Sequence, residues 1–238
     1  MKVGSGDFIY EVIHNWGRLP AGWSLGSVPN GACDSQGRVY VFTRSEHPVL
    51  VFDPDGRFLG SWGEDIFSRP HGILITPDDI AYCTDDKDHT VRKCTLDGKV
   101  LMTLGTKDQP TDTGYDGKNW RTIKKSGPPF HRPTNLALSP GGDMYVSDGY
   151  GNARVHKFSP EGKLLFSWGE PGDGPGQFAI VHSVRTDKKG LSTSLTGKTP
   201  ASSCLPPRVN LSPSGRTCRS PRDSTWVRMG CSIPLKSR

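Results

Sequence analysis

The sequence has few apolar residues and no long apolar run. Only 33% of its 238 residues are hydrophobic. No stretch approaches the roughly 18 apolar residues that would cross a membrane. The segment from Met1 to Trp16 holds a single lysine, and Asp7, Glu11 and His14 interrupt any apolar run there, which argues against a signal peptide. We therefore expect a cytoplasmic protein with no membrane partner.

Most of the chain also lacks an excess of charge of either sign. Residues 191–238 hold eight Lys or Arg and one acid, whereas the residues before them hold 22 basic and 23 acidic side chains. The net charge of +6 therefore arises from the last fifth of the chain. A nearly neutral body gives no reason to expect a nucleic-acid partner.

Glycine and proline, in contrast, are abundant, and they punctuate an internal repeat. Three in-phase copies occupy residues 37–63, 80–105 and 143–169. Each has two short strands, an Asp-Gly or Glu-Gly hairpin and a third strand that ends in Trp-Gly or Leu-Gly. The spacing between Gly63 and Gly105 is typical of one four-stranded propeller blade. The repeat predicts an all-β propeller rather than a generic β-sandwich.

The interval between the next two repeat glycines is longer. The chain between Gly105 and Gly169 carries an insert near residues 106–129 that the preceding interval lacks. The insert is polar and rich in Gly and Pro, which predicts a surface loop over the binding face of the propeller.

Four segments, in order along the chain, carry a more specific resemblance. They are Thr43–Pro48, Arg69–Ile73, Ser147–Arg154 and Pro175–Ser183. Together they resemble the NHL class of β-propeller, which is six-bladed, and within it the peptidyl-α-hydroxyglycine α-amidating lyases. The resemblance covers about residues 8–190. It divides the chain into a partial NHL propeller, residues 1–190, and a tail, residues 191–238.

Two histidines are candidate metal ligands. His71 and His182 occupy matching places, each just before the inner strand of its blade. Two imidazoles so placed could share one metal ion, with metal–nitrogen bonds of about 2.0–2.1 Å; alternatively, each histidine caps its strand. The resemblance implies that both bind zinc, together with a third histidine from a later blade.

The resemblance also implies two catalytic residues. Tyr150 matches the catalytic tyrosine of the lyases, and Arg44 matches an arginine positioned at the substrate. A phenol is a poor base until a metal or arginine stabilises its phenolate, and a guanidinium can hold a carboxylate or an oxyanion. The alternatives are a strand-end aromatic for Tyr150 and an ion-paired loop residue for Arg44.

Several other polar residues are expected to be structural. We interpret four other histidines of the body as packing or surface groups (His47, His89, His131 and His156). Three residues resemble the turn network of NHL blades (Asp148, Asn152 and Arg154). Two cysteines lie on adjacent strands and are expected to be buried thiols (Cys83 and Cys94).

The tail differs in composition from the body. Residues 191–238 contain no Phe, Tyr or His, and they hold ten Ser and six Pro. Read one nucleotide earlier, with free choice of third bases, Ser192 to Gly215 can encode VYVADRENARVQLFAPQGEFITQW. That string repeats the blade MYVSDGYGNARVHKFSPEGKLLFSW with one gap. We therefore interpret the tail as the product of a frameshift, disordered and without regular strands, whose basic charge carries no function.

These observations lead to one main functional hypothesis and two alternatives. The first is a monomeric zinc lyase that cleaves the C–N bond of an α-hydroxyglycine or carbinolamide, in a small-molecule or peptide substrate, to an amide and glyoxylate. The runner-up is a non-catalytic NHL propeller that binds a peptide or protein. A lactonase-type hydrolase would need acidic calcium ligands on the inner strands, and the sequence offers no such set. As written, the chain is expected to be inactive or nearly so, because the third zinc histidine and a second active-site arginine occur only in the shifted frame.

Overall fold

The structure, a computed structural model, describes residues 1–174, 176–187, 192–196 and 203–205. It is almost entirely β. Three four-stranded antiparallel sheets follow one another along the chain, and we call them blades A, B and C. Blade A contains β3 (Asn30–Cys33), β4 (Val39–Phe42), β5 (Val49–Phe52) and β6 (Phe58–Trp62). Blade B contains β7 (Pro70–Ile75), β8 (Ala81–Asp85), β9 (Thr90–Cys94) and β10 (Val100–Leu104). Blade C contains β11 (Pro133–Leu138), β12 (Met144–Asp148), β13 (Arg154–Phe158) and β14 (Leu164–Trp168).

A fourth sheet and three small elements complete the described part of the chain. The fourth sheet is formed by β17 (Val181–Thr186), β18 (Ser192–Thr196) and β19 (Ser203–Leu205). A hairpin precedes blade A, made of β1 (Lys2–Ser5) and β2 (Phe8–Glu11). A short parallel pair follows blade C, made of β15 (Glu170–Pro171) and β16 (Gln177–Phe178). A 3₁₀ turn, η1 (Trp120–Thr122), lies in the long connection between blades B and C.

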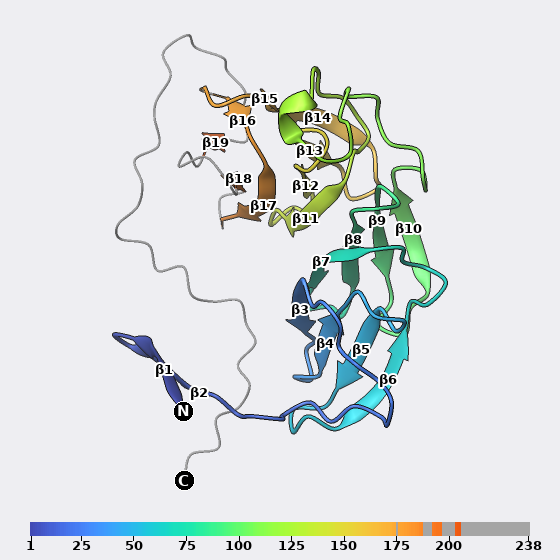
Figure 1. Ribbon diagram of the computed structural model, residues 1–238, viewed down its shortest axis with the longest axis vertical. Coiled ribbons are helices and arrows are strands. Elements are labelled where there is room, and N and C mark those ends of the chain that lie inside the picture. Colours follow the sequence, from blue (N-terminus) through green and yellow to red (C-terminus); the bar gives the residue numbers. More distant parts are fainter. Residues whose placement is uncertain (175, 188–191, 197–202, 206–238) are drawn as a thin grey trace.

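The sheets follow one another around an arc (Figure 1). The first strand of each sheet contacts the first strand of the next, in the order β3, β7, β11 and β17. The strands that contain Ile73 and Val184 are therefore innermost, as the repeat predicts. This is the radial arrangement of propeller blades.

The hydrophobic core is divided among the gaps between neighbouring sheets. One cluster joins blades A and B through Phe42, Trp62 and Ile73. A second joins blades B and C through residues such as Val91 and Phe158. A third packs blade C against β17, and it also takes in Ile123 from the long connection. Each interface therefore stabilises two sheets that are consecutive in the sequence.

A glycine at the end of each outer strand lets an aromatic ring pack closely. Gly63, Gly105 and Gly169 follow β6, β10 and β14, and all have positive φ (100°, 80° and 100°). A Cβ atom there would lie 2.8, 2.9 and 2.3 Å from the rings of Phe67, Phe130 and Phe178, respectively. The same Gly–Phe contact thus recurs in every blade, and each phenylalanine lies four residues before position 71, 134 or 182 of an inner strand.

The structure corrects two expectations about the ends of the propeller. The first blade begins at Asn30, so residues 8–29 form no blade strand and β2 pairs with β1 instead. The predicted absence of strands after residue 190 is wrong for β18 and β19, which pair in antiparallel fashion next to β17. The rest of the tail lies outside the described residues. Among the residues that the structure describes, none belongs to a helix with the length and apolar character of a membrane span.

Candidate functional site

Three predicted site residues meet at one point near the inner strands. His71 lies on β7, His182 lies on β17, and Tyr150 lies in the turn between β12 and β13. The hydroxyl oxygen of Tyr150 is 3.1 Å from His71 Nε2 and 3.0 Å from His182 Nε2. The two imidazole centroids are 5.0 Å apart. The two imidazole side chains come from separate sheets and are thus close enough to bind a common ligand.

Hydrogen bonding defines the form of each ring in this centre. His71 Nδ1 lies 2.7 Å from the carbonyl oxygen of Thr134, which can only accept, so Nδ1 carries the hydrogen. In a neutral ring, His71 Nε2 is then an acceptor for the Tyr150 hydroxyl. His182 Nε2–H can in turn donate to the same phenol oxygen. One hydroxyl group therefore satisfies both contacts.

Glycines next to the site residues bring the sheets together. A Cβ atom at Gly149 would lie 1.9 Å from the carbonyl oxygen of Val181, so the turn that carries Tyr150 rests directly on the backbone of β17. A Cβ atom at Gly72 would lie 2.7 Å from the carbonyl oxygen of Thr134. Side chains at these two positions would separate the blades and pull the three functional groups apart.

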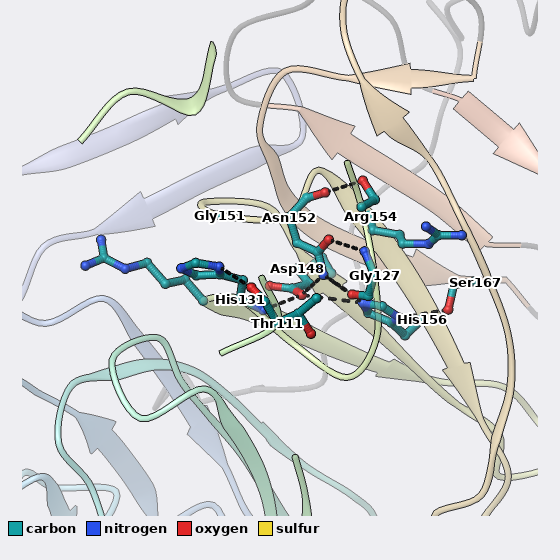
Figure 2. A network of polar contacts seen from close by, with 12 residues as sticks. Thr111, Gly127, His131, Asp148, Gly151, Asn152, Arg154, His156 and Ser167 are labelled. Carbon is teal, nitrogen blue, oxygen red and sulfur yellow. Dashed lines mark hydrogen bonds and ion pairs between the residues drawn. The ribbon is translucent and has the colours of Figure 1, made fainter. Parts of the chain in front are cut away.

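A buried polar network supports the turn that carries Tyr150 (Figure 2). One carboxylate oxygen of Asp148 accepts hydrogen bonds from His131 N, at 2.8 Å, and from Asn152 Nδ2, at 2.6 Å. His156 Nε2 lies 3.4 Å from the same oxygen, and the ring is fully buried. The predicted link between Asp148 and Asn152 is present. Arg154 instead contacts Glu170, at 3.4 Å.

The long connection of residues 106–129 closes around the same turn. Asn152 exchanges two hydrogen bonds with the backbone of Gly127, at 2.9 and 2.5 Å. Thr113 Oγ1 donates to the carbonyl oxygen of Gly151, at 2.7 Å. Thr113 and Ile123 are buried, so the segment is more than the polar surface loop that its composition predicts. It holds the residues that follow Tyr150 in the turn.

Arg44 lies beside this centre with a buried acid that the sequence did not single out. Its Nε donates to the carbonyl oxygen of Pro70, at 3.0 Å, and its terminal nitrogen lies 3.6 Å from Asp86 Oδ2. Arg69 contacts both carboxylate oxygens of Asp86 at 3.2 Å. Burial raises the pKa of Asp86 to about 6, against the opposing effect of both arginines.

Desolvation and charge also shift the pKa values of the three converging groups. Burial, followed by the charge of His182 and then of Arg44 and Arg69, lowers the pKa of His71 to about 4. Desolvation lowers the pKa of His182. Burial and the charge of Asp86 raise the pKa of Tyr150, while the nearby arginines act in the opposite direction. At neutral pH the centre therefore consists of two neutral imidazoles and a phenol.

The donor set fits two ligands of a zinc ion. Neutral imidazole is the form that binds metals, and a backbone carbonyl on Nδ1 of His71 is a common way to orient a metal-binding ring. Among the described residues, no group of three or more His, Cys, Asp or Glu side chains is placed to hold a metal. His71 and His182 would therefore supply two ligands, fewer than the three or four of a typical zinc site.

The other residues that we interpret as structural from the sequence lie in packed surroundings. His47 stacks on Trp23, with centroids 3.3 Å apart, and contacts Glu64. His89 Nδ1 accepts a hydrogen bond from the backbone of Arg132. Cys83 and Cys94 are buried free thiols, as expected.

Comparison with known proteins identifies the relatives of the chain. Peptidylglycine alpha-amidating monooxygenase of Rattus norvegicus is 33% identical over 213 residues, which cover 76% of this chain and 20% of that protein. Peptidyl-alpha-hydroxyglycine alpha-amidating lyase 1 of Drosophila melanogaster is 36% identical over 129 residues, 52% of this chain and 21% of that protein. The homologues of the chain thus include α-amidating lyases. NHL repeat-containing protein 3 of Homo sapiens is 32% identical over 194 residues, 76% of this chain and 52% of that protein. The chain spans between a fifth and about half of these amidating and NHL-repeat relatives, and no family model matches it.

Solved structures confirm the fold. Streptogramin B lyase matches with a TM-score of 0.53 at 12% identity, over 75% of this chain and 53% of that chain. The WD40 β-propeller domain of Doa1 matches with a TM-score of 0.52 at 14% identity, over 71% of this chain and 48% of that chain. The prediction of a β-propeller is therefore confirmed, as is the resemblance to NHL-repeat proteins and amidating lyases.

Proposed function

We propose that the His71–Tyr150–His182 centre is the active site of a zinc-dependent lyase that acts on an α-hydroxyglycine. The reaction breaks the C–N bond of the carbinolamide and releases an amide and glyoxylate. The observation that carries the proposal is the convergence of both Nε2 atoms on the Tyr150 hydroxyl, at 3.1 and 3.0 Å. Relatives whose names specify this lyase support it, at 36% identity for the Drosophila melanogaster protein.

The reaction needs a proton to leave the substrate hydroxyl and a proton to reach the departing nitrogen. The electrons of the O–H bond form the carbonyl of glyoxylate, and those of the C–N bond go to the nitrogen. No oxidant is needed, and a single acid–base group can take up the first proton and return it to the amide. Tyr150 is the group that we assign to this transfer. Arg44 is placed to stabilise negative charge that develops on the substrate oxygen.

The metal would be held by His71 and His182, with further ligands from outside the described residues or from substrate and water. Bound zinc would lower the pKa of the substrate hydroxyl, and its charge would favour the phenolate form of Tyr150. Without that charge the phenol is protonated and donates to His71. Once Tyr150 has taken up the substrate proton, its phenol is the acid that delivers that proton to the leaving nitrogen.

We also propose that the tail is translated out of frame and that the chain as written is impaired. The restored string places VYVAD at residues 192–196, where β18 lies, and VYVAD corresponds to MYVSD of β12 in blade C. It also places RVQLF at residues 201–205, which include β19 and correspond to RVHKF of β13. The likeness of the restored string to the blade sequence of residues 144–158 is the observation that supports this proposal. Sequencing the gene across the Gly190 codon tests this directly.

The test of the lyase is to measure glyoxylate release from an N-acyl-α-hydroxyglycine, with zinc supplied. The chain as written and a frame-restored chain are compared, and Tyr150→Phe is introduced into the restored chain. The expected loss of kcat for this variant is about 10²–10⁴-fold, the usual effect of removing a general acid–base group. Tyr115→Phe is the control, because it makes the same change on a ring that lies 5.3 Å from His131.

Three results would contradict parts of the proposal. Equal activity of the two chains would show that residues missing from the tail are not needed. Unchanged kcat in Tyr150→Phe would remove the proposed role of that residue. No activity in either chain would favour the runner-up, a non-catalytic propeller that binds a peptide.

A further inference from the structure

The carboxylate of Asp86 is enclosed between two arginines at the edge of the site. Its side chain is 0% exposed, while those of Arg44 and Arg69 are 24% and 40% exposed. Arg69 reaches both oxygens at 3.2 Å, and Arg44 reaches one at 3.6 Å. A buried acid thus holds two cations that remain partly open to solvent.

Backbone contacts tie the same three residues to the strand that carries His71. Arg44 Nε donates to the carbonyl oxygen of Pro70, the residue that precedes His71. The backbone N–H of Asp86 donates to the carbonyl oxygen of Arg69, at 3.2 Å. The guanidinium group of Arg44 and the backbone of Asp86 are therefore both anchored to the segment that leads into the site.

The neighbouring acid, Asp85, has a different role. Its carboxylate accepts backbone N–H groups from Ser68, Arg69, Lys87 and Asp88, at 2.6–3.0 Å. It stabilises the loop backbone and makes no contact with either guanidinium group among the described hydrogen bonds and ion pairs. Asp86 is thus the acid that the two arginines share.

We propose that Asp86 is a positioning residue that holds Arg44 and Arg69 as a pair, and that this pair binds the carboxylate of the substrate. The inference rests on the proposed lyase function and adds Arg69 and Asp86 to its substrate-binding residues. Two guanidinium groups offer ten N–H donors, far more than one carboxylate can accept. The donors that remain, and the charge that Asp86 leaves uncompensated, suit a second carboxylate, which guanidinium groups bind with paired hydrogen bonds.

The position of the pair matches the chemistry of the substrate. An α-hydroxyglycine carries its carboxylate on the same carbon that bears the hydroxyl group and the C–N bond. A carboxylate held beside His71 would therefore place the reacting carbon close to His71 and Tyr150. Such positioning lowers the entropic cost of reaching the reactive geometry.

The experiment compares Asp86→Asn, Arg69→Gln and Arg69→Lys in the frame-restored chain. Each is assayed with an N-acyl-α-hydroxyglycine and with the matching carboxamide, which lacks the negative charge. The controls are Asp53→Asn and Arg57→Gln, an exposed pair at 3.1 Å in which Arg57 is 75% exposed. Thermal unfolding of every variant verifies folding, and Arg69→Gln alters a side chain that is already partly exposed.

The expected result is a rise in KM for the acid on the order of tenfold or more in Asp86→Asn and Arg69→Gln, the effect of losing one charge-assisted hydrogen bond. KM for the carboxamide should change less than about twofold, any fall in kcat should be shared by the two substrates, and Arg69→Lys should recover part of the loss in KM for the acid. Equal effects on the acid and the carboxamide, or an effect on kcat alone, would overturn the proposal.

Binding of glyoxylate separates this proposal from the lyase function. The ion carries the same carboxylate and can be titrated into the chain by calorimetry without turnover. Glyoxylate binding that weakens about tenfold in Arg69→Gln would uphold the arginine pair even if no lyase activity is found. The proposal would be overturned if the frame-restored chain failed to bind glyoxylate, or if its Arg69→Gln variant bound glyoxylate equally well.

Discussion

Replacement of Gly149 by alanine is expected to separate Tyr150 from β17. The added Cβ atom would lie 1.9 Å from the carbonyl oxygen of Val181, whereas ordinary contact begins near 3.4 Å. The turn must therefore move by well over one ångström. The contact between Tyr150 and His182 is 3.0 Å long. A movement of this size takes it beyond the limit of a hydrogen bond, about 3.5 Å.

The expected loss of unfolding free energy in Gly149→Ala follows from the atoms that the new methyl group meets. The obstacle is backbone, which cannot rotate away, so the added methyl group should cost about 1–3 kcal/mol of unfolding free energy. Loss of the hydroxyl contact adds about 1 kcal/mol. Urea unfolding measures the sum. Gly141→Ala is the matched control, because it lies in the same blade and its Cβ atom would approach other atoms no closer than 3.9 Å.

A double-mutant cycle tests the reason for the effect. Tyr150→Phe alone should cost about 1 kcal/mol, and it should cost almost nothing when Gly149→Ala has already broken the hydroxyl contact. Additive effects of the two substitutions would mean that the turn had not moved. A Gly149→Ala variant within about 0.5 kcal/mol of Gly141→Ala would refute the close approach itself.

Three further predictions concern stability and metal binding. Gly105→Ala, with a φ of 80° and a Cβ atom 2.5 Å from a carbonyl oxygen, should destabilise more in urea than Gly117→Ala, where φ is 86° and nothing lies within 4 Å; strain alone costs about 1–2 kcal/mol. Because the pKa of Asp86 is raised to about 6, the folded chain binds this proton more tightly than the unfolded chain. Stability should then fall by up to about 3 kcal/mol between about pH 4 and pH 6, and a urea series on Asp86→Asn should lack this slope. Zinc affinity, measured by competition with a chromophoric chelator, should fall at least about tenfold in His182→Ala and stay unchanged in His47→Ala.

The repeat pattern was sufficient to predict the blades and the meeting of two histidines. The Trp-Gly and Leu-Gly ends fix the phase of each blade, so positions 71 and 182 fall at equivalent places on inner strands. Local sequence carries this information because each blade is built from consecutive hairpins. The meeting of Tyr150 with both histidines could be expected only from the family resemblance, since a turn residue has no fixed place in the repeat.

The sequence did not reveal the acid between the arginines. Asp86 and Arg44 are distant in the sequence and lie in loops of different blades, so no local pattern links them. Asp86 also follows Asp85, and two adjacent acids resemble an ordinary solvated turn. The packing of Ile123 was missed for a similar reason, because a polar Gly-rich segment hides one buried side chain.

The Gly–Phe contacts give the protein a nearly one-dimensional organisation. Each contact and each core cluster joins sheets that are neighbours in sequence, so stability is close to a sum of blade and interface contributions. Such a chain can unfold one blade at a time from either end. The centre of His71, Tyr150 and His182 is different, because it connects blade B to the fourth sheet across blade C. A ligand bound there would join non-adjacent units and convert stepwise unfolding into a single cooperative transition.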